Sequence, residues 1–259
     1  LDRRKIEDQI AKLRKDLEQV KEQRETQRKQ RRKNAVPVVS IVGYTNAGKS
    51  TIMNQLLMKM GQEDSKQVFE KNMLFATLET SVRNIELPDN KSFLLTDTVG
   101  FVSKLPHHLV KAFRSTLEEA RDSDLLLHVV DVSNEEHSFM MDVTNETLKA
   151  VGVEDIPTIY VYNKSDLANV KYPLVSGDNI WLSAKDGAGL DELIELIKLY
   201  IFSDYITCKM LIPYDKGNVV SYLNEVATVM TTSYEEEGTL LEIEIKQSDY
   251  NKYEQYVIK

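Results

Sequence analysis

The 259-residue sequence predicts an α/β fold with a mostly parallel sheet, preceded by a helical coiled-coil segment and followed by a small α+β domain. The first observation is that strand-like and helix-like apolar patterns alternate from residue 37 to residue 203, which favours a sheet covered on both faces. The second is an apolar seam in the charged amino-terminal segment, and the third is a shorter succession of strand and helix patterns after Tyr200. We therefore expect three parts, which are residues 1–34, 35–204 and 205–259.

The amino-terminal part combines a coiled-coil seam with a basic tract. The seam consists of apolar residues spaced at 4, 3, 4 and 3 positions, namely Ile6, Ile10, Leu13, Leu17 and Val20. Residues 1–33 carry a net charge of +6 and the remainder carries −14, and cations dominate from Arg24 to Lys33. Two interpretations are open: a solvated helical linker, or a segment that contacts the phosphates of RNA.

The middle part is expected to form a sheet with its ligand loops at one edge. Strands are predicted at residues 37–42, 82–87, 92–96, 125–131, 157–162 and 179–182, and helices at 50–60, 107–122, 138–151 and 190–203. Because Pro88-Asp89-Asn90-Lys91 is typical of a hairpin turn, one edge strand should be antiparallel. The loops at the carboxyl ends of the parallel strands should gather around the ligand.

The last part predicts a small βαββ-type domain. Its elements are a strand from Lys209 to Ile212, a helix over 215–229 and a strand over 239–245. In the last strand, apolar residues alternate with glutamates, which indicates one buried face. Gly238, after three consecutive glutamates, indicates a hairpin turn.

The composition indicates the compartment of the protein. Cys208 is the only cysteine, so no internal disulfide can form and nothing indicates an oxidising compartment. No apolar run reaches about 18 residues and the charged amino terminus lacks a signal-peptide core, so we expect a soluble, cytoplasmic protein with no membrane span. Because the chain starts at Leu1, we expect a fragment or a processed product.

A phosphate-binding loop is predicted between the first strand and the helix after it. The segment fits the pattern G-x-x-x-x-G-K-S/T at every fixed position, and it consists of Gly43, Tyr44, Thr45, Asn46, Ala47, Gly48, Lys49 and Ser50, with Thr51 next in the helix. The glycines let the backbone curl around phosphates, Lys49 can reach the β- and γ-phosphate oxygens, and Ser50 can ligate Mg²⁺. The phosphates would lie at a helix N-terminus, where free amides favour negative charge. The sequence therefore predicts a nucleotide-binding protein.

A second segment predicts the metal end of the site. It consists of Asp97, Thr98, Val99 and Gly100, and it follows the apolar strand Phe93-Leu94-Leu95. From the end of that strand Asp97 would anchor Mg²⁺, and the Gly100 amide would face the γ-phosphate.

Two further segments predict the base. Asn163, Lys164, Ser165 and Asp166 follow an apolar strand, and the Asp166 carboxylate can accept two hydrogen bonds from the N1–H and the exocyclic amine of guanine. Adenine has no such donor pair, so Asp166 would select GTP over ATP. Ser183, Ala184 and Lys185 follow the next apolar run, and the Ala184 amide could bond the guanine carbonyl. Each segment is weak evidence alone, but their order, each after a predicted strand, is a strong signal.

Together these segments resemble the translation-factor-like class of small P-loop GTPases, and the flanking sequence resembles the HflX family of ribosome-associated GTPases. The family pattern is matched by Leu74-Phe75-Ala76-Thr77-Leu78, by Asp97 to Phe101 running into Leu105 to Val110, by Ala112 to Glu119, and upstream by Asp2-Arg3-Arg4 and Arg24 to Arg28. The resemblance extends to about Tyr200 and implies a P-loop GTPase domain. The family has an N-terminal domain and a Gly-rich loop before this point, and neither occurs in this sequence.

The first switch of such a domain is expected within residues 61–80. The resemblance places Thr77 as the residue that closes onto Mg²⁺, and Thr80 is the alternative that spacing leaves open. The neighbours expected in the nucleotide site are Phe75, Ala76 and Leu78. GTP binding would order residues 70–80 and 97–110, and hydrolysis would release them.

The residue after Gly100 departs from the wider GTPase pattern. Many relatives carry a glutamine that orients the attacking water, whereas Phe101 has no such group, so intrinsic hydrolysis should be slow and depend on a partner, a cation or both. In several GTPases similar to this class, an asparagine at the position of Asn46 helps to hold K⁺ against the phosphates. His107 and His108 suit a helix start better than a catalytic role. The expected catalytic groups are Lys49, Thr77, Gly100 and Asn46.

These inferences predict a GTP-hydrolysing switch that cycles between GTP and GDP and acts on the ribosome. The expected target is the large subunit with its RNA, and the expected action is subunit separation or rescue. Two alternatives are an RNA-binding ribosome assembly factor and a coiled-coil interaction protein regulated by GTP. The full-length protein is expected to be a monomer.

Overall fold

The structure, a computed structural model, describes residues 36–61, 81–98, 100, 120–153 and 155–258. The coiled-coil seam, the basic tract and most of the helix predicted at 107–122 therefore lie outside the described residues. Nine residues considered above as site or catalytic groups also lie outside the described residues, namely Phe75, Ala76, Thr77, Leu78, Thr80, Val99, Phe101, His107 and His108.

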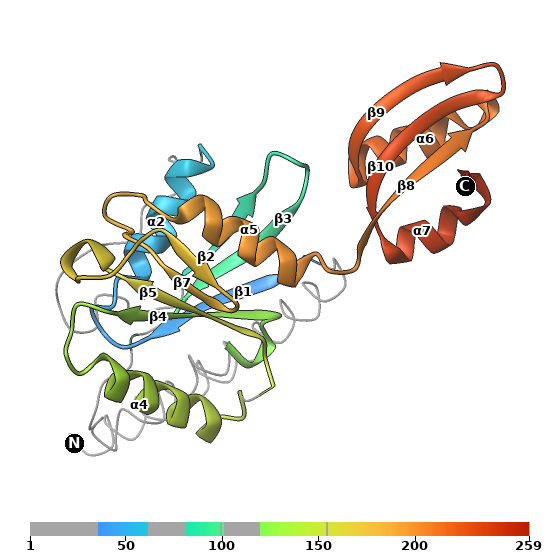
Figure 1. Ribbon diagram of the computed structural model, residues 1–259. Helices are drawn as coiled ribbons and strands as arrows, with labels where there is room; N and C mark the ends of the chain where they lie inside the picture. The colour runs from blue at the N-terminus through green and yellow to red at the C-terminus, as the bar shows by residue number, and fades with distance from the viewer. Residues whose placement is uncertain (1–35, 62–80, 99, 101–119, 154, 259) are drawn as a thin grey trace, which may run out of the picture. The chain divides into compact units, whose positions relative to one another are not determined.

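The alternating patterns of the middle part form a seven-stranded sheet in the order β2-β3-β1-β4-β5-β7-β6 (Figure 1). Its strands are β1 (Val38–Gly43), β2 (Ser81–Glu86), β3 (Ser92–Asp97), β4 (Leu125–Asp131), β5 (Thr158–Asn163), β6 (Leu174–Ser176) and β7 (Asn179–Trp181). The five central strands β3, β1, β4, β5 and β7 run parallel, and the edge strands β2 and β6 are antiparallel to their neighbours. The prediction of a mostly parallel sheet with an antiparallel edge is confirmed.

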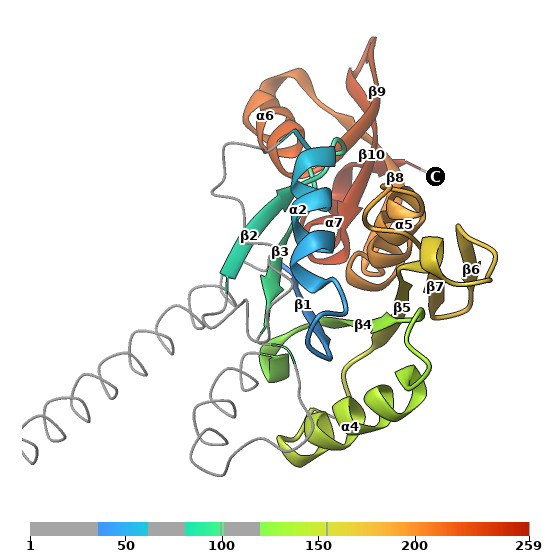
Figure 2. The same cartoon turned by 90° about the vertical axis from the view of Figure 1, so that its left-hand side faces the viewer.

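Helices cover both faces of this sheet. They are α2 (Lys49–Lys59), α4 (His137–Ala150) and α5 (Leu190–Ile201), and α4 lies on the opposite face from α2 and α5 (Figure 2). The alternation of side chains along β4 explains why both faces are covered. Leu125 and Leu127 pack in the core that includes residues of α2 and α5. Leu126 points to the other face and packs in the core that includes Leu148 of α4.

The strand order places a ligand crevice at the end of β1. The chain leaves β1 toward β3 on one side, and β4 pairs with β1 on the other side. In open α/β sheets such a reversal leaves a crevice outside the carboxyl ends of the strands. The loops after β1, β3, β4, β5 and β7 therefore surround one site.

Residues 205–258 form a second sheet of four strands in the order β11-β8-β10-β9. The elements are β8 (Tyr205–Ile212), α6 (Gly217–Val226), β9 (Thr228–Glu235), β10 (Gly238–Lys246), α7 (Gln247–Tyr253) and β11 (Val257–Ile258), with 3₁₀ turns at Tyr214–Lys216 and Glu254–Tyr256. As the alternation predicted, Leu241, Ile243 and Ile245 are fully buried. That these residues form a domain of their own remains a prediction.

Several element boundaries differ from the sequence prediction. The helix predicted over 215–229 ends at Val226, because the β-branched residues Thr228 and Val229 pair with β10 as part of β9. The first strand starts at Tyr205 and not at Lys209, since β8 pairs with β10 along its whole length. Residues 120–122 of the helix predicted at 107–122 form a 3₁₀ turn. The short elements β6, α7 and β11 were not predicted, because two- to seven-residue segments carry little periodicity.

Candidate functional site

The loop between β1 and α2 has the backbone that the phosphate-binding pattern requires. Gly43 has a φ of 142°, and a Cβ there would lie 2.2 Å from the carbonyl oxygen of Val129. Gly48 has a φ of 95°, and a Cβ there would lie 2.2 Å from Nδ2 of Asn163. Only glycine satisfies both conditions at these positions. The two glycines thus let the loop curl while β4 and β5 approach it closely.

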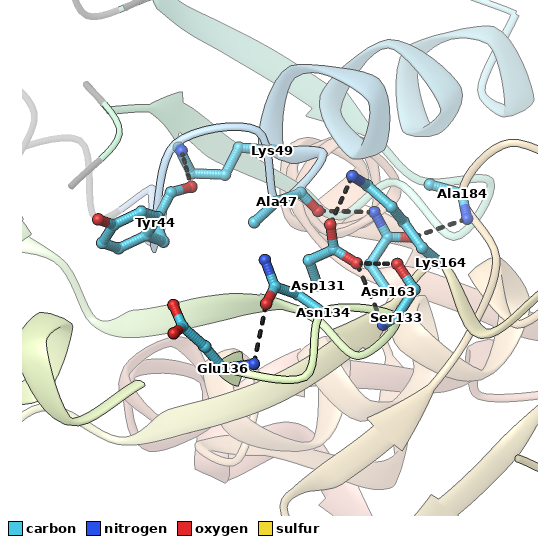
Figure 3. A network of polar contacts seen from close by, with 10 residues as sticks. All are labelled: Tyr44, Ala47, Lys49, Asp131, Ser133, Asn134, Glu136, Asn163, Lys164 and Ala184. Carbon is cyan, nitrogen blue, oxygen red and sulfur yellow. Dashed lines mark hydrogen bonds and ion pairs between the residues drawn. The ribbon is translucent and has the colours of Figure 1, made fainter. Parts of the chain in front are cut away.

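Lys49 is held at the centre of this curl. Its ammonium donates a hydrogen bond to the carbonyl oxygen of Tyr44 at 3.0 Å (Figure 3) and another to that of Gly43 at 3.1 Å. Burial lowers the pKa of Lys49 to about 8, while the negative charge of Asp97 opposes that shift. Phosphate oxygens placed beside this buried ammonium would accept charge-assisted hydrogen bonds from it and stabilise its charged form.

Ser50 and Asp97 meet at the metal end of the site. The Ser50 hydroxyl donates a 2.7 Å hydrogen bond to Oδ2 of Asp97, whose side chain is fully buried. Strand pairing places them together, because Asp97 at the end of β3 lies opposite Ile41 of β1. Thr98 fixes the same strand end by donating its hydroxyl to the Ile41 carbonyl at 2.7 Å.

These two side chains fit Mg²⁺. Mg²⁺ prefers hard oxygen ligands and is commonly bound through one or two protein groups plus water and substrate phosphates. In the part of the chain that the structure describes, no group of three His, Cys, Asp or Glu residues could hold a metal by itself. A hydroxyl beside one buried carboxylate, next to a phosphate loop, therefore suits a metal that arrives with a nucleotide.

Gly100 brings the segment after β3 against the phosphate loop. A Cβ on Gly100 would lie 2.8 Å from Nζ of Lys49 and 2.8 Å from Cγ2 of Thr45. No larger residue fits without displacing one of these groups. The predicted γ-phosphate amide is thus next to the ammonium predicted to bind the same phosphate.

Asn163 joins the phosphate loop to the base-recognition segments. Its Nδ2 donates to the Ala47 carbonyl at 2.9 Å, and its Oδ1 accepts from the Ala184 amide at 3.0 Å (Figure 3). One buried side chain therefore fixes three loops that come from the ends of β1, β5 and β7.

The predicted base-binding residues lie together after β5 and β7. Ser183 donates its hydroxyl to Oδ1 of Asp166 at 2.9 Å, and the Ser165 amide donates to the Leu182 carbonyl at 3.2 Å. Asp166 is half-buried, whereas Lys185 is exposed. These hydrogen bonds tie the segment after β5, with the Asp166 carboxylate, to the segment after β7 that contains Ser183.

The sequence reasoning missed one residue of this network, Asp131 at the end of β4. Oδ2 of Asp131 accepts a 2.6 Å hydrogen bond from Nζ of Lys164 (Figure 3). Oδ1 accepts from the amide of Ser133 at 3.1 Å and from its hydroxyl at 2.5 Å. A signal was available, since Asp131 follows an apolar strand as Asp97 does.

A cavity of about 170 Å³ lies between the phosphate loop and the segment after β4. Its lining includes Tyr44, Asn46, Asp131 and Asn134, together with His128 in its wall. Burial lowers the pKa of His128 to about 4, with a smaller raising effect from a hydrogen bond to Asn145 and a lowering effect from Lys49. The wall is therefore uncharged at His128 near neutral pH.

The comparisons with known proteins agree on one family. A family described as 50S ribosome-binding GTPase matches residues 38–164. A GTPase HflX from Lacrimispora saccharolytica is 44% identical over 241 residues, which are 92% of this chain and 55% of that protein. A GTPase HflX from Caldanaerobacter subterraneus subsp. tengcongensis is 41% identical over 247 residues, 95% of this chain and 55% of that protein. The chain spans about half the length of these relatives.

A solved structure shares the fold of the first sheet. The crystal structure of a GTP-binding protein from Sulfolobus solfataricus in complex with GDP has a TM-score of 0.51 and 28% identity to this chain. The match covers 64% of this chain and 53% of that protein. Within the described ranges, no helix is long and apolar enough to cross a membrane.

Proposed function

The chain belongs to the HflX family of GTPases, and on that basis we propose that it binds GTP, hydrolyses it to GDP and phosphate, and acts as a molecular switch on the ribosome. The Asn163 side chain is the observation that carries the nucleotide part of this proposal. It holds the phosphate loop at Ala47 and the base-recognition segment at Ala184 in one network, so a single nucleotide can span both ends.

The roles of the site residues follow from this arrangement. The phosphate loop from Gly43 to Thr51 binds the phosphates, with Lys49 on the β- and γ-phosphate oxygens. Ser50, Asp97 and Thr77 are the proposed Mg²⁺ ligands, and the bound ion would offset charge on the phosphate oxygens. Gly100 would donate its amide to the γ-phosphate. The remaining contacts of this end come from Phe75, Ala76, Leu78, Thr98 and Val99.

The base end of the proposed site selects guanine. Asp166 would accept from the two guanine donors, and the Ala184 amide, whose N–H is accepted by Oδ1 of Asn163 in this structure, would turn to the guanine carbonyl when the base binds. Asn163 and Ser183 contact these two groups through their hydrogen bonds to Ala184 and Asp166. Lys164, Ser165 and Lys185 complete this end.

Hydrolysis is proposed to be slow in the isolated protein. Phe101 cannot orient water, so the missing stabilisation would come from the ribosome, from K⁺ bound at Asn46, or from both. A positive charge that stabilises the transferring phosphoryl group increases the rate by about 10³ to 10⁵. A ribosomal contact that supplies such a charge would make hydrolysis depend on binding.

We also propose that three parts of the chain have different roles. Residues 1–34 would form a basic helical arm, residues 35–204 the GTPase domain and residues 205–259 a small carboxyl-terminal domain. The arm carries a net charge of +6 over residues 1–33, which supports contact with ribosomal RNA phosphates. The large subunit, subunit separation or rescue, and a cytoplasmic location belong to the same proposal.

The test is GTP turnover with the purified large subunit, the purified small subunit and neither. The proposal expects slow release of phosphate alone and a marked acceleration with the large subunit. Lys49→Ala serves as the inactive control, because it removes the phosphate-binding ammonium. Turnover that neither subunit accelerates would refute the ribosomal part, and no binding of guanine nucleotide would refute the whole.

A second assay separates this proposal from an RNA-binding factor. Binding to the large subunit should depend on whether GTP or GDP is present, since only the switch proposal links affinity to the nucleotide. A complex that ignores the nucleotide and weakens steeply with salt would favour RNA binding by the basic arm.

A further inference from the structure

Asp131 connects two loops of the site and belongs to none of its motifs. One carboxylate oxygen accepts the Lys164 ammonium at 2.6 Å, and the other accepts two hydrogen bonds from Ser133. The Asp131 and Lys164 side chains are only 17% and 25% exposed. An ion pair with this little exposure and an additional hydrogen-bonded carboxylate oxygen is well defined in geometry.

Strand pairing fixes the position of this ion pair. Asp131 at the end of β4 lies opposite Asn163 at the end of β5, and the Val132 amide donates to the Asn163 carbonyl at 3.1 Å. Lys164 comes directly after Asn163 and has left-handed backbone, with φ 61° and ψ 32°. This conformation is uncommon for a residue with a Cβ, so the direction of the Lys164 side chain is set by the backbone as well as by Asp131.

Lys164 lies in the sequence between a residue that contacts the phosphate loop and the residue proposed to recognise the base. Its neighbour Asn163 contacts the phosphate loop at Ala47, while Asp166 carries the proposed base recognition. The ammonium ends on Asp131, which lines the cavity beside Tyr44 and Asn46 of the phosphate loop. The methylene stem of Lys164 therefore extends from the end of β5 to Asp131 at the end of β4 (Figure 3).

We propose that Asp131 is a positioning residue for guanine-nucleotide binding, because it fixes the Lys164 side chain as a preformed apolar wall for the nucleoside. This inference rests on the proposed function. A free lysine side chain has many rotamers to lose when a ligand packs on it, and an ion pair made before binding removes that cost. The effect should appear for ligands with a nucleoside and be absent for a bare phosphate chain.

The experiment measures calorimetric affinities of the whole chain for Mg²⁺–GDP and for Mg²⁺–tripolyphosphate. Asp131→Asn keeps the size of the side chain but removes the charge that holds Lys164. We expect GDP affinity to fall about 3- to 10-fold, the loss from ordering one long side chain on binding, with tripolyphosphate affinity unchanged. Asp142→Asn removes the same charge from an exposed position on α4 and should change neither affinity.

A double-mutant cycle distinguishes positioning from a general structural role. Lys164→Met keeps most of the stem but cannot pair with Asp131, so it should lose about as much GDP affinity as Asp131→Asn. The double variant should lose little more than either single variant, because both changes break one interaction.

The outcomes separate this proposal from the proposed function. No GDP binding by the unchanged chain would overturn both. Normal GDP binding by the unchanged chain together with full affinity in Asp131→Asn, additive losses in the double variant, or equal losses for GDP and tripolyphosphate would overturn the positioning role alone. If Asp131→Asn does not fold, Lys164→Met decides by itself, since unchanged GDP affinity in that variant excludes a preformed wall.

Discussion

The Ser50 hydroxyl lies 2.7 Å from Oδ2 of Asp97 and donates a hydrogen bond to it, although the residues belong to α2 and β3. Pairing of β1 with β3 produces this contact, because it places the end of β3 beside the phosphate loop. Two of the three oxygen ligands proposed for Mg²⁺, Ser50 and Asp97, are therefore brought together by the pairing of the strands itself. Preformed ligands reduce the cost of ordering the site on binding.

Ser50→Ala should weaken binding of Mg²⁺–GTP about 10- to 100-fold, the range expected for removing a ligand or hydrogen bond to a charged group. The measurement is affinity for a non-hydrolysable GTP analogue with Mg²⁺ and with EDTA. The loss should be large with Mg²⁺ and small with EDTA. Asp191→Asn breaks an exposed 2.9 Å pair with Lys59 and serves as the control. Equal losses under both conditions would exclude Ser50 as a metal ligand.

Gly100→Ala should impair binding of triphosphate more than binding of diphosphate. The added Cβ would lie 2.8 Å from Nζ of Lys49 and 2.9 Å from Cα of Thr45, so the ammonium or the Gly100 segment must move. Such overlap costs about 1–3 kcal/mol, or roughly 5- to 150-fold in affinity for a GTP analogue. The control is Gly217→Ala, where a Cβ meets nothing within 4 Å. Similar losses for GTP and GDP would contradict a contact specific to the γ-phosphate.

The sequence predicted the strands and helices of the fold more fully than it predicted the hydrogen bonds between residues of the site. The strands that lead into Asp97 and Asn163 were predicted because apolar runs and motif spacing are both local signals. The hydrogen bond from Asn163 to Ala47 depends on which strands are neighbours, and the link between Asp131 and Lys164 depends on β4 and β5 being paired. A lone aspartate after a strand carries no motif, so sequence reasoning passed over it.

The carboxyl-terminal sheet shows the same limit. The alternation in β10 is strong and its buried face was predicted. Most side chains of β9 are exposed, so its sequence carries no alternation of apolar and polar residues that could predict a strand. Hydrogen bonding to β10 determines that this segment is a strand.

Asp166→Asn should change the base preference from guanine toward xanthine. The carboxylate offers two acceptors to the two guanine donors, whereas an amide offers one donor and one acceptor, which suits xanthine. Competition between GDP and xanthosine diphosphate measures the preference. Asp186→Asn removes an exposed carboxylate from the neighbouring loop and should leave the preference for guanine intact. An unchanged preference in Asp166→Asn would remove Asp166 from the base site.

Nucleotide binding should take up protons above neutral pH because of Lys49. Burial lowers the pKa of Lys49 to about 8, and phosphates placed beside the ammonium would raise it. The bound state then holds more protons than the free state from about pH 7 up to the raised pKa of the bound form, so affinity falls as the pH rises through this window. We expect uptake of about half a proton per GTP at pH 8, measured by calorimetry in buffers of different ionisation enthalpy. A heat of binding that is independent of the buffer would contradict this coupling.

The last prediction is that K⁺ accelerates intrinsic hydrolysis through Asn46. Asn46 has a φ of 62° and an exposed side chain in the phosphate loop, so its amide oxygen is accessible to an ion beside the phosphates. A cation held there would stabilise negative charge that develops on the transferring phosphoryl group. We expect hydrolysis in KCl to exceed that in NaCl at equal ionic strength by on the order of 10-fold.

The choice of variant decides whether the K⁺ test is clean. Asn46→Ala would combine loss of the amide with strain, because alanine disfavours a φ of 62°. Asn46→Gly removes the amide and tolerates the same backbone, so it should retain nucleotide binding and lose the difference between KCl and NaCl. Equal rates in KCl and NaCl would contradict the prediction. The left-handed backbone at position 46 would then be sufficient to explain the asparagine there. A K⁺ effect that persists in Asn46→Gly would place the ion elsewhere, because no amide oxygen would remain at position 46 to hold it.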